Sequence, residues 1–170
     1  MDILKERDAN PSLLEGRKVI VMGYGNQGRP QALNLRDSGV DTEVAAREGG
    51  GGWARALEDG FSPVGLEEGA RRADILLCLL PDELQGKIFG ETISANLREG
   101  AALCFAHGFA VAFGSVKSDR HDIVLVAPKG QGSMLRKAYV EGSGLPCLVA
   151  VENDYSGRAR DVALAVAWGL

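Results

Sequence analysis

The chain has 170 residues, of which 45% are hydrophobic and 25% are charged, values typical of a globular domain. Its 19 basic and 23 acidic residues give a net charge of −4, which argues against the broad basic surface that binding to nucleic acid requires. No apolar run approaches the roughly 18 residues of a membrane span, and the polar first residues lack a signal-peptide core. We therefore expect one cytoplasmic domain over residues 1–170, with neither a membrane nor nucleic acid as its partner.

Short apolar runs alternate along the chain with longer segments of helical character. The predicted strands are 18–22, 42–46, the weak 61–64, 75–80, 102–106, 123–127 and 147–151. The predicted helices are 30–39, 53–60, 65–73, 83–100, 134–144 and 156–170, the last capped by Ser156. Most of the strands are apolar at every position, as parallel strands covered on both faces are. The pattern predicts an α/β fold with a doubly wound, mostly parallel sheet and helices on both faces.

The three cysteines, Cys78, Cys104 and Cys147, each lie within an apolar run. Their odd number and wide spacing argue against a disulfide framework or a paired-cysteine metal site. We expect buried thiols that take no part in chemistry.

A glycine pattern follows the first strand directly. The sequence Gly23-Tyr24-Gly25-Asn26-Gln27-Gly28 fits GxGxxG within a βαβ unit of about 30 residues. Gly23 would make the tight turn, Gly25 would let the backbone approach a diphosphate, and Gly28 would let helix and strand pack closely. This context favours a Rossmann-type NAD(P) site, with the phosphates at the helix N-terminus, over a glycine-rich turn that binds nothing.

Arg47 follows the second strand, where an arginine can grip the 2'-phosphate of NADP and an acid would hold the ribose of NAD. NADP is therefore favoured, although NAD stays open because Glu48 is adjacent and Gly49–Gly52 carry no hydroxyl groups. The backbone N–H groups of this glycine run offer a second way to bind an anion. The alternative reading of Arg47 is a solvated surface side chain.

Polar residues also follow three later strands, where ligands of open α/β sheets bind. His107 comes directly after 102–106 and could exchange a proton with a carbonyl that is being reduced, or it could be an ordinary loop histidine. Asp82 and its neighbours follow 75–80 and line the cleft, cap the next helix, or do both. Lys129 follows 123–127 and faces either an anion or solvent. His121 lies in a polar stretch, and we expect it to be solvated.

The acidic residues do not form a recognisable metal site. They occur mostly as adjacent pairs, and no helical face presents two acids at i and i+4. The sequence therefore predicts no Mg²⁺ ligands within this chain.

Taken together, these segments resemble the N-terminal domain of ketol-acid reductoisomerase (acetohydroxyacid isomeroreductase). The resemblance is carried in order by LLEGRKVIVMGYGNQGRPQALNLRDSGV, REGGGGW, ADILLCLLPDELQ, GAALCFAHGF, VLVAPKGQG and EGSGLPCLVAVENDYSGRARDVALAVAWG. It implies an NADPH-dependent, Mg²⁺-requiring oxidoreductase of branched-chain amino-acid (isoleucine and valine) biosynthesis. Such an enzyme converts 2-acetolactate or 2-aceto-2-hydroxybutyrate into a 2,3-dihydroxy acid by alkyl migration and hydride transfer.

The resemblance also implies residue roles. His107 would be the catalytic histidine of the family. The dinucleotide would be bound by Gly23, Tyr24, Gly25, Asn26, Gln27, Gly28, Arg47, Gly50, Gly52, Asp82, Glu83, Leu84, Gln85 and Gly132.

The sequence departs from the family pattern at four places. Asn26 replaces a serine, and Arg29 and Pro30 replace a histidine-alanine pair in the first loop. Gly50 and Gly52 replace the serines that would contact the 2'-phosphate, which leaves the choice between NADPH and NADH open. Gln131 and Ser133 replace a proline and a histidine in a third loop, and the helical C-terminal domain that supplies the Mg²⁺ ligands and most of the substrate pocket would begin past Leu170.

Three functions therefore stay open at this point. The first is the cofactor-binding domain of a ketol-acid reductoisomerase, which would meet its small 2-hydroxy-ketoacid substrate only together with a C-terminal domain. The second is an NAD(P)-binding module without turnover. The third is a small reductase of another substrate, acting as a homodimer.

Overall fold

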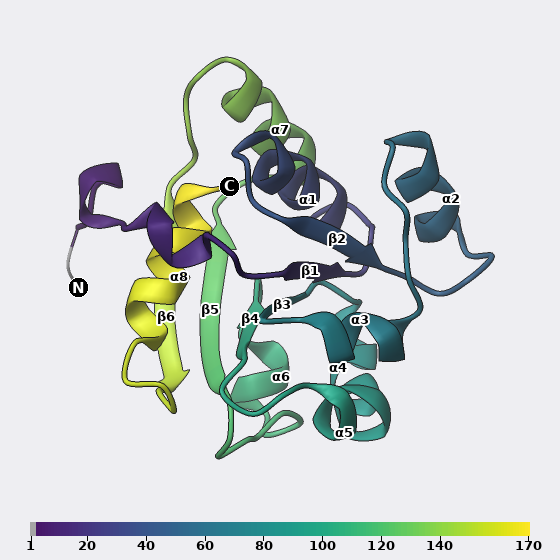
Figure 1. Ribbon diagram of the computed structural model, residues 1–170. Helices are drawn as coiled ribbons and strands as arrows, with labels where there is room; N and C mark the ends of the chain where they lie inside the picture. The colour runs from purple at the N-terminus through teal and green to yellow at the C-terminus, as the bar shows by residue number, and fades with distance from the viewer. Residues whose placement is uncertain (1–2) are drawn as a thin grey trace.

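Six strands form one sheet in the order β2-β1-β3-β4-β5-β6 in the computed structural model, which describes residues 3–170 (Figure 1). Strands β1 to β5 are parallel, and β6 pairs antiparallel with β5 at one edge. The strands are β1 Val19–Met22, β2 Thr42–Ala45, β3 Ile75–Cys78, β4 Ala102–Phe105, β5 Asp122–Pro128 and β6 Cys147–Asn153. The mostly parallel, doubly wound sheet predicted from the apolar runs is confirmed.

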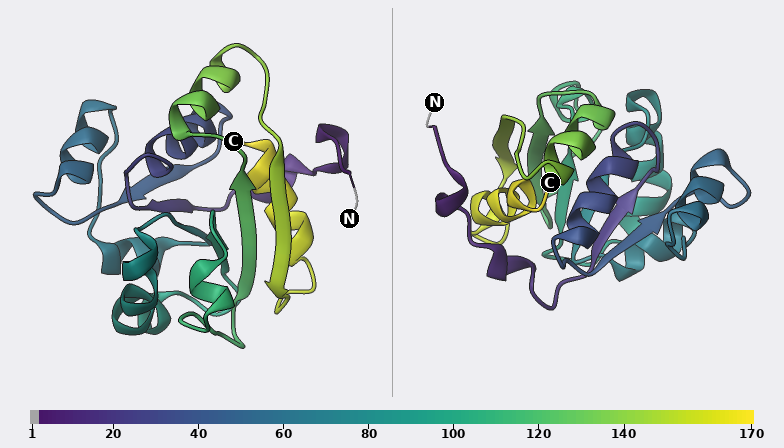
Figure 2. Two further views of the ribbon diagram at one scale, coloured as in Figure 1. Left: turned by 180° about the vertical axis from the view of Figure 1, so that it is seen from behind. Right: turned by 90° about the horizontal axis from the view of Figure 1, so that it is seen from above.

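Helices cover both faces of this sheet, and the views from behind and from above show the layers (Figure 2). The helices are α1 Gly28–Asp37, α2 Gly51–Glu58, α3 Leu66–Arg72, α4 Asp82–Ile88, α5 Ser94–Asn96, α6 Phe109–Ala112, α7 Gly132–Val140 and α8 Ala159–Trp168. A π-helical turn, Phe89–Ile93, joins α4 to α5, and two 3-10 turns, Glu6–Asp8 and Pro11–Leu14, precede β1. Helix α2 lies at the edge of the molecule beyond β2 (Figures 1 and 2).

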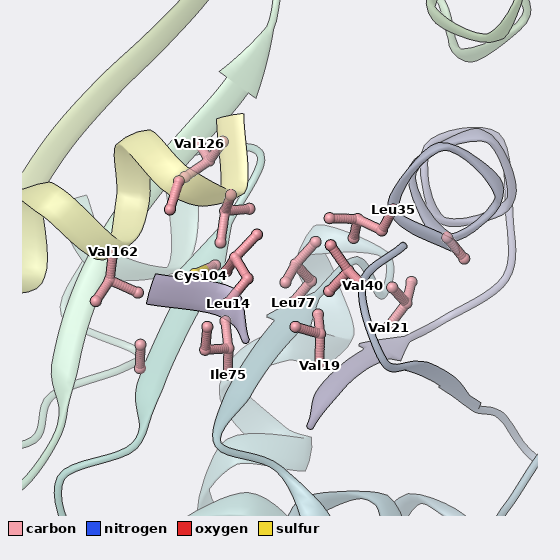
Figure 3. Packing of buried hydrophobic residues seen from close by; sticks show 14 of the residues in the cluster. Leu14, Val19, Val21, Leu35, Val40, Ile75, Leu77, Cys104, Val126 and Val162 are labelled. Atoms are coloured by element: carbon pink, nitrogen blue, oxygen red, sulfur yellow. The ribbon is translucent and has the colours of Figure 1, made fainter. Parts of the chain in front are cut away.

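The core consists of two apolar clusters, one on each face of the sheet. Alternate residues of a strand point to opposite faces, so Val19 and Val21 pack in one cluster with Leu35 of α1 and Val162 of α8 (Figure 3). Ile20 and Met22 pack in the other, with side chains of α3 and of the π-helical turn. All four residues of β1, β3 and β4 are buried, which explains why these runs are continuously apolar.

Two predicted elements differ from the observed ones. Residues 61–64 form no strand and contribute a single bridge, Val64 to Ala45, because Pro63 has no N–H to donate to a ladder. The helix predicted over 83–100 is interrupted by the π-helical turn and ends at Asn96. It contains Gly86 and Gly90, which weaken a regular helix.

The predicted cap at Ser156 is wrong. The last helix begins at Ala159, and the N–H of Ala159 donates to Oδ1 of Asp154 over 2.9 Å. Ser156 instead donates its hydroxyl to Oδ2 of Asp122, 2.7 Å away, and accepts the N–H of Arg158. The carboxylate of Asp122 is buried, so these bonds join the start of β5 to the loop before α8.

The three cysteines are free thiols. Burial raises the pKa of Cys78 and of Cys104 to about 12, and that of Cys147 to about 11. At neutral pH the thiols are therefore protonated and weakly nucleophilic. Within residues 3–170, no helix combines the length and apolar character needed to cross a membrane.

Candidate dinucleotide site

The order of the strands places a crevice at the carboxyl ends of β1 and β3. Strand β1 is flanked by β2 on one side and β3 on the other, so the chain passes from β1 to β2 on one side and then crosses to β3 on the other. Ligands of open α/β sheets bind at such a switch point. Two cavities of about 830 Å³ and 230 Å³ open there, and they share Gln27, Leu79, Leu80 and Asp82 as lining residues. We treat them as one groove with a larger and a smaller part.

The loop after β1 requires glycine at two positions for packing. Gly23 has a φ of 100°, and a β-carbon there would stand 2.7 Å from the carbonyl oxygen of Leu79. A β-carbon on Gly28 would lie well inside 3.0 Å of the carbonyl oxygen of Gly23. Gly25 differs, because no atom of the described residues, apart from Gly25 and its two chain neighbours, lies within 4 Å of the place where its β-carbon would be. That open space lies on the larger cavity, where a ligand can approach the backbone.

A charged network holds this loop from behind. Tyr24 is buried, and its hydroxyl donates to Oδ2 of Asp59 over 2.8 Å. Arg29 donates twice to the same carboxylate, from Nε over 2.7 Å and from Nη2 over 2.8 Å. The Arg29 bond lowers the pKa of Asp59, while burial and then the Asp59 bond raise the pKa of Tyr24. Because Asp59 directly follows α2, the network ties α2 to the start of α1.

The larger cavity reaches the glycine run before α2. Arg47, Gly50 and Gly52 line it, as does Arg55, which the sequence analysis did not single out. Nη2 of Arg55 donates to the carbonyl oxygen of Tyr24 over 3.1 Å. Its position four residues after Gly51, one helical turn on, is the sequence signal that could have identified it.

A third loop, between β5 and α7, packs directly on the first. Gln27 Nε2 donates to the carbonyl oxygen of Gly130 over 3.1 Å. A β-carbon on Gly132 would lie well inside 3.0 Å of the carbonyl oxygen of Asn26. Gly132 lines neither cavity, so in this structure it contacts the first loop rather than the groove itself.

One residue that lines the smaller cavity, Gln85, has an unpartnered polar atom. Gln85 is 3% exposed, and its Nε2 donates to the carbonyl oxygen of Leu80 and to Oδ1 of Asp82. Its Oε1 is buried and accepts no hydrogen bond from any group in residues 3–170. Leaving such an acceptor unpaired costs about 1–3 kcal/mol, so a donor from a ligand would stabilise it. The N-cap of α4 is Pro81, not Asp82, and the Asp82 carboxylate instead orients Gln85.

His107 stands at the open side of the same cavity, with 68% of its side chain exposed. The N–H of Phe109 donates to its Nδ1 over 3.2 Å, so the neutral ring carries its proton on Nε2. Oδ2 of Asp82 lies 3.5 Å from Nδ1. At this position His107 could contact a carbonyl group that is being reduced in the cavity.

The structure thus brings most of the predicted binding residues together. The larger cavity is lined by Gly23, Tyr24, Gly25, Asn26, Gln27, Arg47, Gly50, Gly52, Asp82 and Leu84, and the smaller one by Gln27, Asp82, Gln85 and His107. Three of the predicted residues, Gly28, Glu83 and Gly132, line neither cavity, and Glu83 is exposed. Lys129 is also exposed and outside both.

The prediction that His121 is solvated is wrong. His121 is 1% exposed, with Nδ1 2.6 Å from the hydroxyl of Ser118 and Nε2 3.3 Å from the carbonyl oxygen of Leu97. It precedes β5 and so lies at the amino end of the sheet, away from the groove. Its polar neighbours in sequence concealed this burial.

The residues present fit a dinucleotide but do not fit Mg²⁺. The glycine cradle at Gly23, Gly25 and Gly28 and the unpaired oxygen of Gln85 suit a phosphate-bearing ligand with N–H or O–H donors. Between residues 3 and 170, no group of three or more His, Cys, Asp or Glu side chains is placed to hold a metal ion.

Comparison with known proteins identifies proteins that are similar to this chain in sequence and in structure. The ketol-acid reductoisomerase (NADP(+)) of Methanopyrus kandleri is 47% identical over 166 residues, which are 97% of this chain and 51% of that protein. An NADH-preferring ketol-acid reductoisomerase from an uncultured archaeon superposes with a TM-score of 0.95 at 42% identity, covering 99% of this chain and 53% of the other. The chain spans about half the length of these relatives.

A more distant structure shares the fold alone. The semialdehyde dehydrogenase NAD-binding protein from Cupriavidus necator has a TM-score of 0.70 at 22% identity, covering 89% of this chain and 58% of the other.

The family model described as the NADPH-binding domain of acetohydroxy acid isomeroreductase matches residues 13–170. The chain therefore belongs to the family of NADPH-binding domains of acetohydroxy acid isomeroreductase, also called ketol-acid reductoisomerase.

Proposed function

We propose that this chain holds the nicotinamide dinucleotide of a ketol-acid reductoisomerase in the groove between the ends of β1 and β3. The diphosphate lies on the backbone of Gly23–Gly28, the adenosine ribose reaches Arg47, and the nicotinamide end lies in the smaller cavity. The observation that carries this proposal is the buried, unpartnered Oε1 of Gln85, a residue that lines that cavity. A ribose hydroxyl or an amide N–H of the ligand would supply the missing donor.

The side chains of the smaller cavity suit the reduction of a carbonyl group. When bound, the cofactor supplies a hydride. His107 holds a proton on Nε2, because Nδ1 already accepts the N–H of Phe109, and this N–H can donate a hydrogen bond to the carbonyl oxygen, which becomes negatively charged as the hydride arrives. Oδ2 of Asp82 lies 3.5 Å from Nδ1 of the ring, and both residues line the same cavity.

The complete reaction needs residues beyond this chain. We infer that the longer enzyme converts 2-acetolactate or 2-aceto-2-hydroxybutyrate into a 2,3-dihydroxy acid, and that the other half of its length supplies the Mg²⁺ ligands and most of the substrate pocket. The length of the relatives supports this division, since this chain covers 51% of the Methanopyrus kandleri protein. A cytoplasmic location and assembly as a homodimer stay predictions.

Calorimetric titration of this chain with NADPH tests the proposal. We expect saturable binding at one site per chain, and a loss of at least tenfold in affinity when Gln85 is replaced by leucine, because the ligand donor then meets no acceptor. Replacing Glu83 with glutamine, on the same helix but outside both cavities, is the matched control. The absence of NADPH binding to the folded chain would contradict the proposal.

A second assay separates the three functions left open by the sequence. With 2-acetolactate, Mg²⁺ and NADPH, we expect the isolated chain to bind the cofactor without turnover. Turnover of 2-acetolactate by this chain would show that the second half is dispensable. NADPH oxidation with a different carbonyl compound would instead favour a small reductase.

A further inference from the structure

Four arginines lie on α1, on the loop after β2 and on α2, and they differ in whether an acid neutralises them. Arg29 is paired with Asp59 through two hydrogen bonds, and Nε of Arg36 lies 3.7 Å from Oδ1 of Asp37. Arg47 and Arg55 both line the larger cavity. Over residues 3–170, neither of these two forms an ion pair with a carboxylate within 4.0 Å. Two arginines without a carboxylate partner within 4.0 Å therefore line a cavity whose one acidic lining residue, within the described part of the chain, is Asp82.

Arg55 is held in place before any ligand arrives. Its Nη2 donates to the carbonyl oxygen of Tyr24, in the diphosphate loop, over 3.1 Å. Its Nη1 lies 3.8 Å from the position that a β-carbon on Gly51 would occupy, so the guanidinium folds back over the first turn of α2. A guanidinium has five N–H donors in a fixed plane, and this bond uses one of them. Donors therefore remain for an anion between α2 and the diphosphate loop.

The glycines around Arg55 leave this space open. Gly50, Gly51 and Gly52 carry no side chains. A β-carbon on Gly52 would lie 3.5 Å from Cβ of Tyr24. The loop after β2 thus contributes backbone N–H groups and no hydroxyl donors. Any strong, charge-assisted contact to an anion here must come from Arg47 or Arg55.

We propose that Arg55 is a specificity-determining residue, which contacts the 2'-phosphate of NADPH together with Arg47. This inference rests on the proposed function, since it requires a dinucleotide in the groove. Arg47 lies on the loop after β2, before the glycine run, Arg55 lies on α2, after it, and both line the larger cavity. They provide the positive charge that distinguishes a 2'-phosphate from the 2'-hydroxyl of NADH.

The rival role for Arg55 is purely to position the diphosphate loop through the carbonyl of Tyr24. Both NADPH and NADH use the diphosphate loop, so in that case the loss of Arg55 weakens both cofactors by the same factor. A direct contact with the 2'-phosphate weakens NADPH alone. The ratio of the two dissociation constants therefore separates the roles.

The experiment is calorimetric titration of the wild-type chain and of Arg55→Ala with NADPH and NADH, and with the fragments adenosine 2',5'-bisphosphate and 5'-AMP. We expect Arg55→Ala to weaken NADPH and the bisphosphate at least tenfold, and NADH and 5'-AMP less than threefold. Arg55→Lys keeps the charge and should recover part of the NADPH affinity. Arg120→Ala removes an exposed arginine next to His121, at the opposite end of the sheet, and should change none of the four affinities.

The outcomes divide cleanly. Equal weakening of NADPH and NADH, or unchanged NADPH affinity in Arg55→Ala, overturns the specificity role while leaving the dinucleotide site intact. A wild-type chain that is folded but binds neither cofactor refutes the proposed function itself. If Arg55→Ala lowers the urea midpoint strongly, the comparison rests on Arg55→Lys and on Arg55→Gln, which retains a donor for Tyr24 but carries no charge.

Discussion

The backbone of Gly132, at the start of α7, lies against the carbonyl oxygen of Asn26 in the diphosphate loop. The side chain of Pro30 closes the same contact, with Cγ 2.9 Å from where a β-carbon on Gly132 would be. Together with the bond from Gln27 to Gly130, this contact makes the β5–α7 loop part of the wall that supports the site. The importance of Gly132 for cofactor binding is therefore expected to be indirect.

Replacing Gly132 with alanine should push the two loops apart. We expect the free energy of unfolding to fall by about 1–3 kcal/mol, as for other overpacked positions, and the affinity for both NADPH and NADH to fall with it. Urea denaturation and calorimetry measure the two effects. Gly65→Ala is the control. Gly65 is the residue directly before α3, and no atom of the described residues beyond its chain neighbours lies within 4 Å of its missing β-carbon. Unchanged stability in Gly132→Ala would contradict the contact.

Gly25 and Gly28 belong to one motif but should respond differently to alanine. Among residues 3–170, no atom beyond Gly25 and its two chain neighbours lies within 4 Å of its missing β-carbon, so Gly25→Ala should keep its urea midpoint while losing at least tenfold in affinity for both dinucleotides. Gly28→Ala should instead destabilise the fold, because its β-carbon would collide with the carbonyl of Gly23. Full NADPH affinity in the folded Gly25→Ala chain would remove this loop from the site.

The strands and the glycine loop were predictable because their signals are local. The runs 18–22 and 75–80 are continuously apolar since both faces of β1 and β3 are covered, and GxGxxG stands directly between a strand and a helix. Local patterns also predicted that residues after different strands would meet, because parallel strands end at one edge of the sheet.

The contacts behind the site were not predictable in the same way. Tyr24 and Asp59 are 35 positions apart, and no periodicity links a tyrosine in a loop to an acid after a helix. His121 lies among charged residues and is nonetheless buried, because the carbonyl of Leu97, 24 positions earlier, accepts its ring N–H. Such pairs depend on how helices dock on the sheet, which is a tertiary property.

The Asp59 carboxylate should make stability depend on acid pH. The Arg29 guanidinium lowers the pKa of Asp59 below its ordinary value of 3.8, so the unfolded chain binds more protons than the folded chain as the pH falls below that value. The stabilisation is complete above pH 3.8 and is lost as the pH falls through the lowered pKa. We expect Asp59→Asn to lower the free energy of unfolding by about 1–3 kcal/mol at pH 7, with the difference from wild type shrinking below pH 4.

Urea titrations of wild type and Asp59→Asn at pH 7, 5 and 3.5 measure this difference. The pKa of Glu68 is also lowered, by Arg72 and Arg71, but this carboxylate is present in both proteins, so its contribution cancels. Glu83→Gln is the control, because it also replaces a carboxylate with an amide, but at an exposed position. A difference that grows as the pH falls would show that the ion pair with Arg29 does not stabilise the fold.

The hydrogen bonds of His121 should stabilise the amino end of the sheet without affecting the cofactor site. Ser118 Oγ lies 2.6 Å from Nδ1 and the carbonyl oxygen of Leu97 lies 3.3 Å from Nε2, so the neutral ring donates to Leu97 and accepts from Ser118. We expect His121→Ala to lower the free energy of unfolding by about 2–4 kcal/mol, because it leaves a cavity and unpaired polar groups. Ser118→Ala should cost about 1 kcal/mol, and the double variant should cost less than the sum, because both single changes remove the same bond. NADPH affinity should stay within twofold of wild type in all three variants. Additive costs in the urea titrations would show that the two side chains do not interact, and a large change in NADPH affinity would show that the two ends of the sheet are coupled.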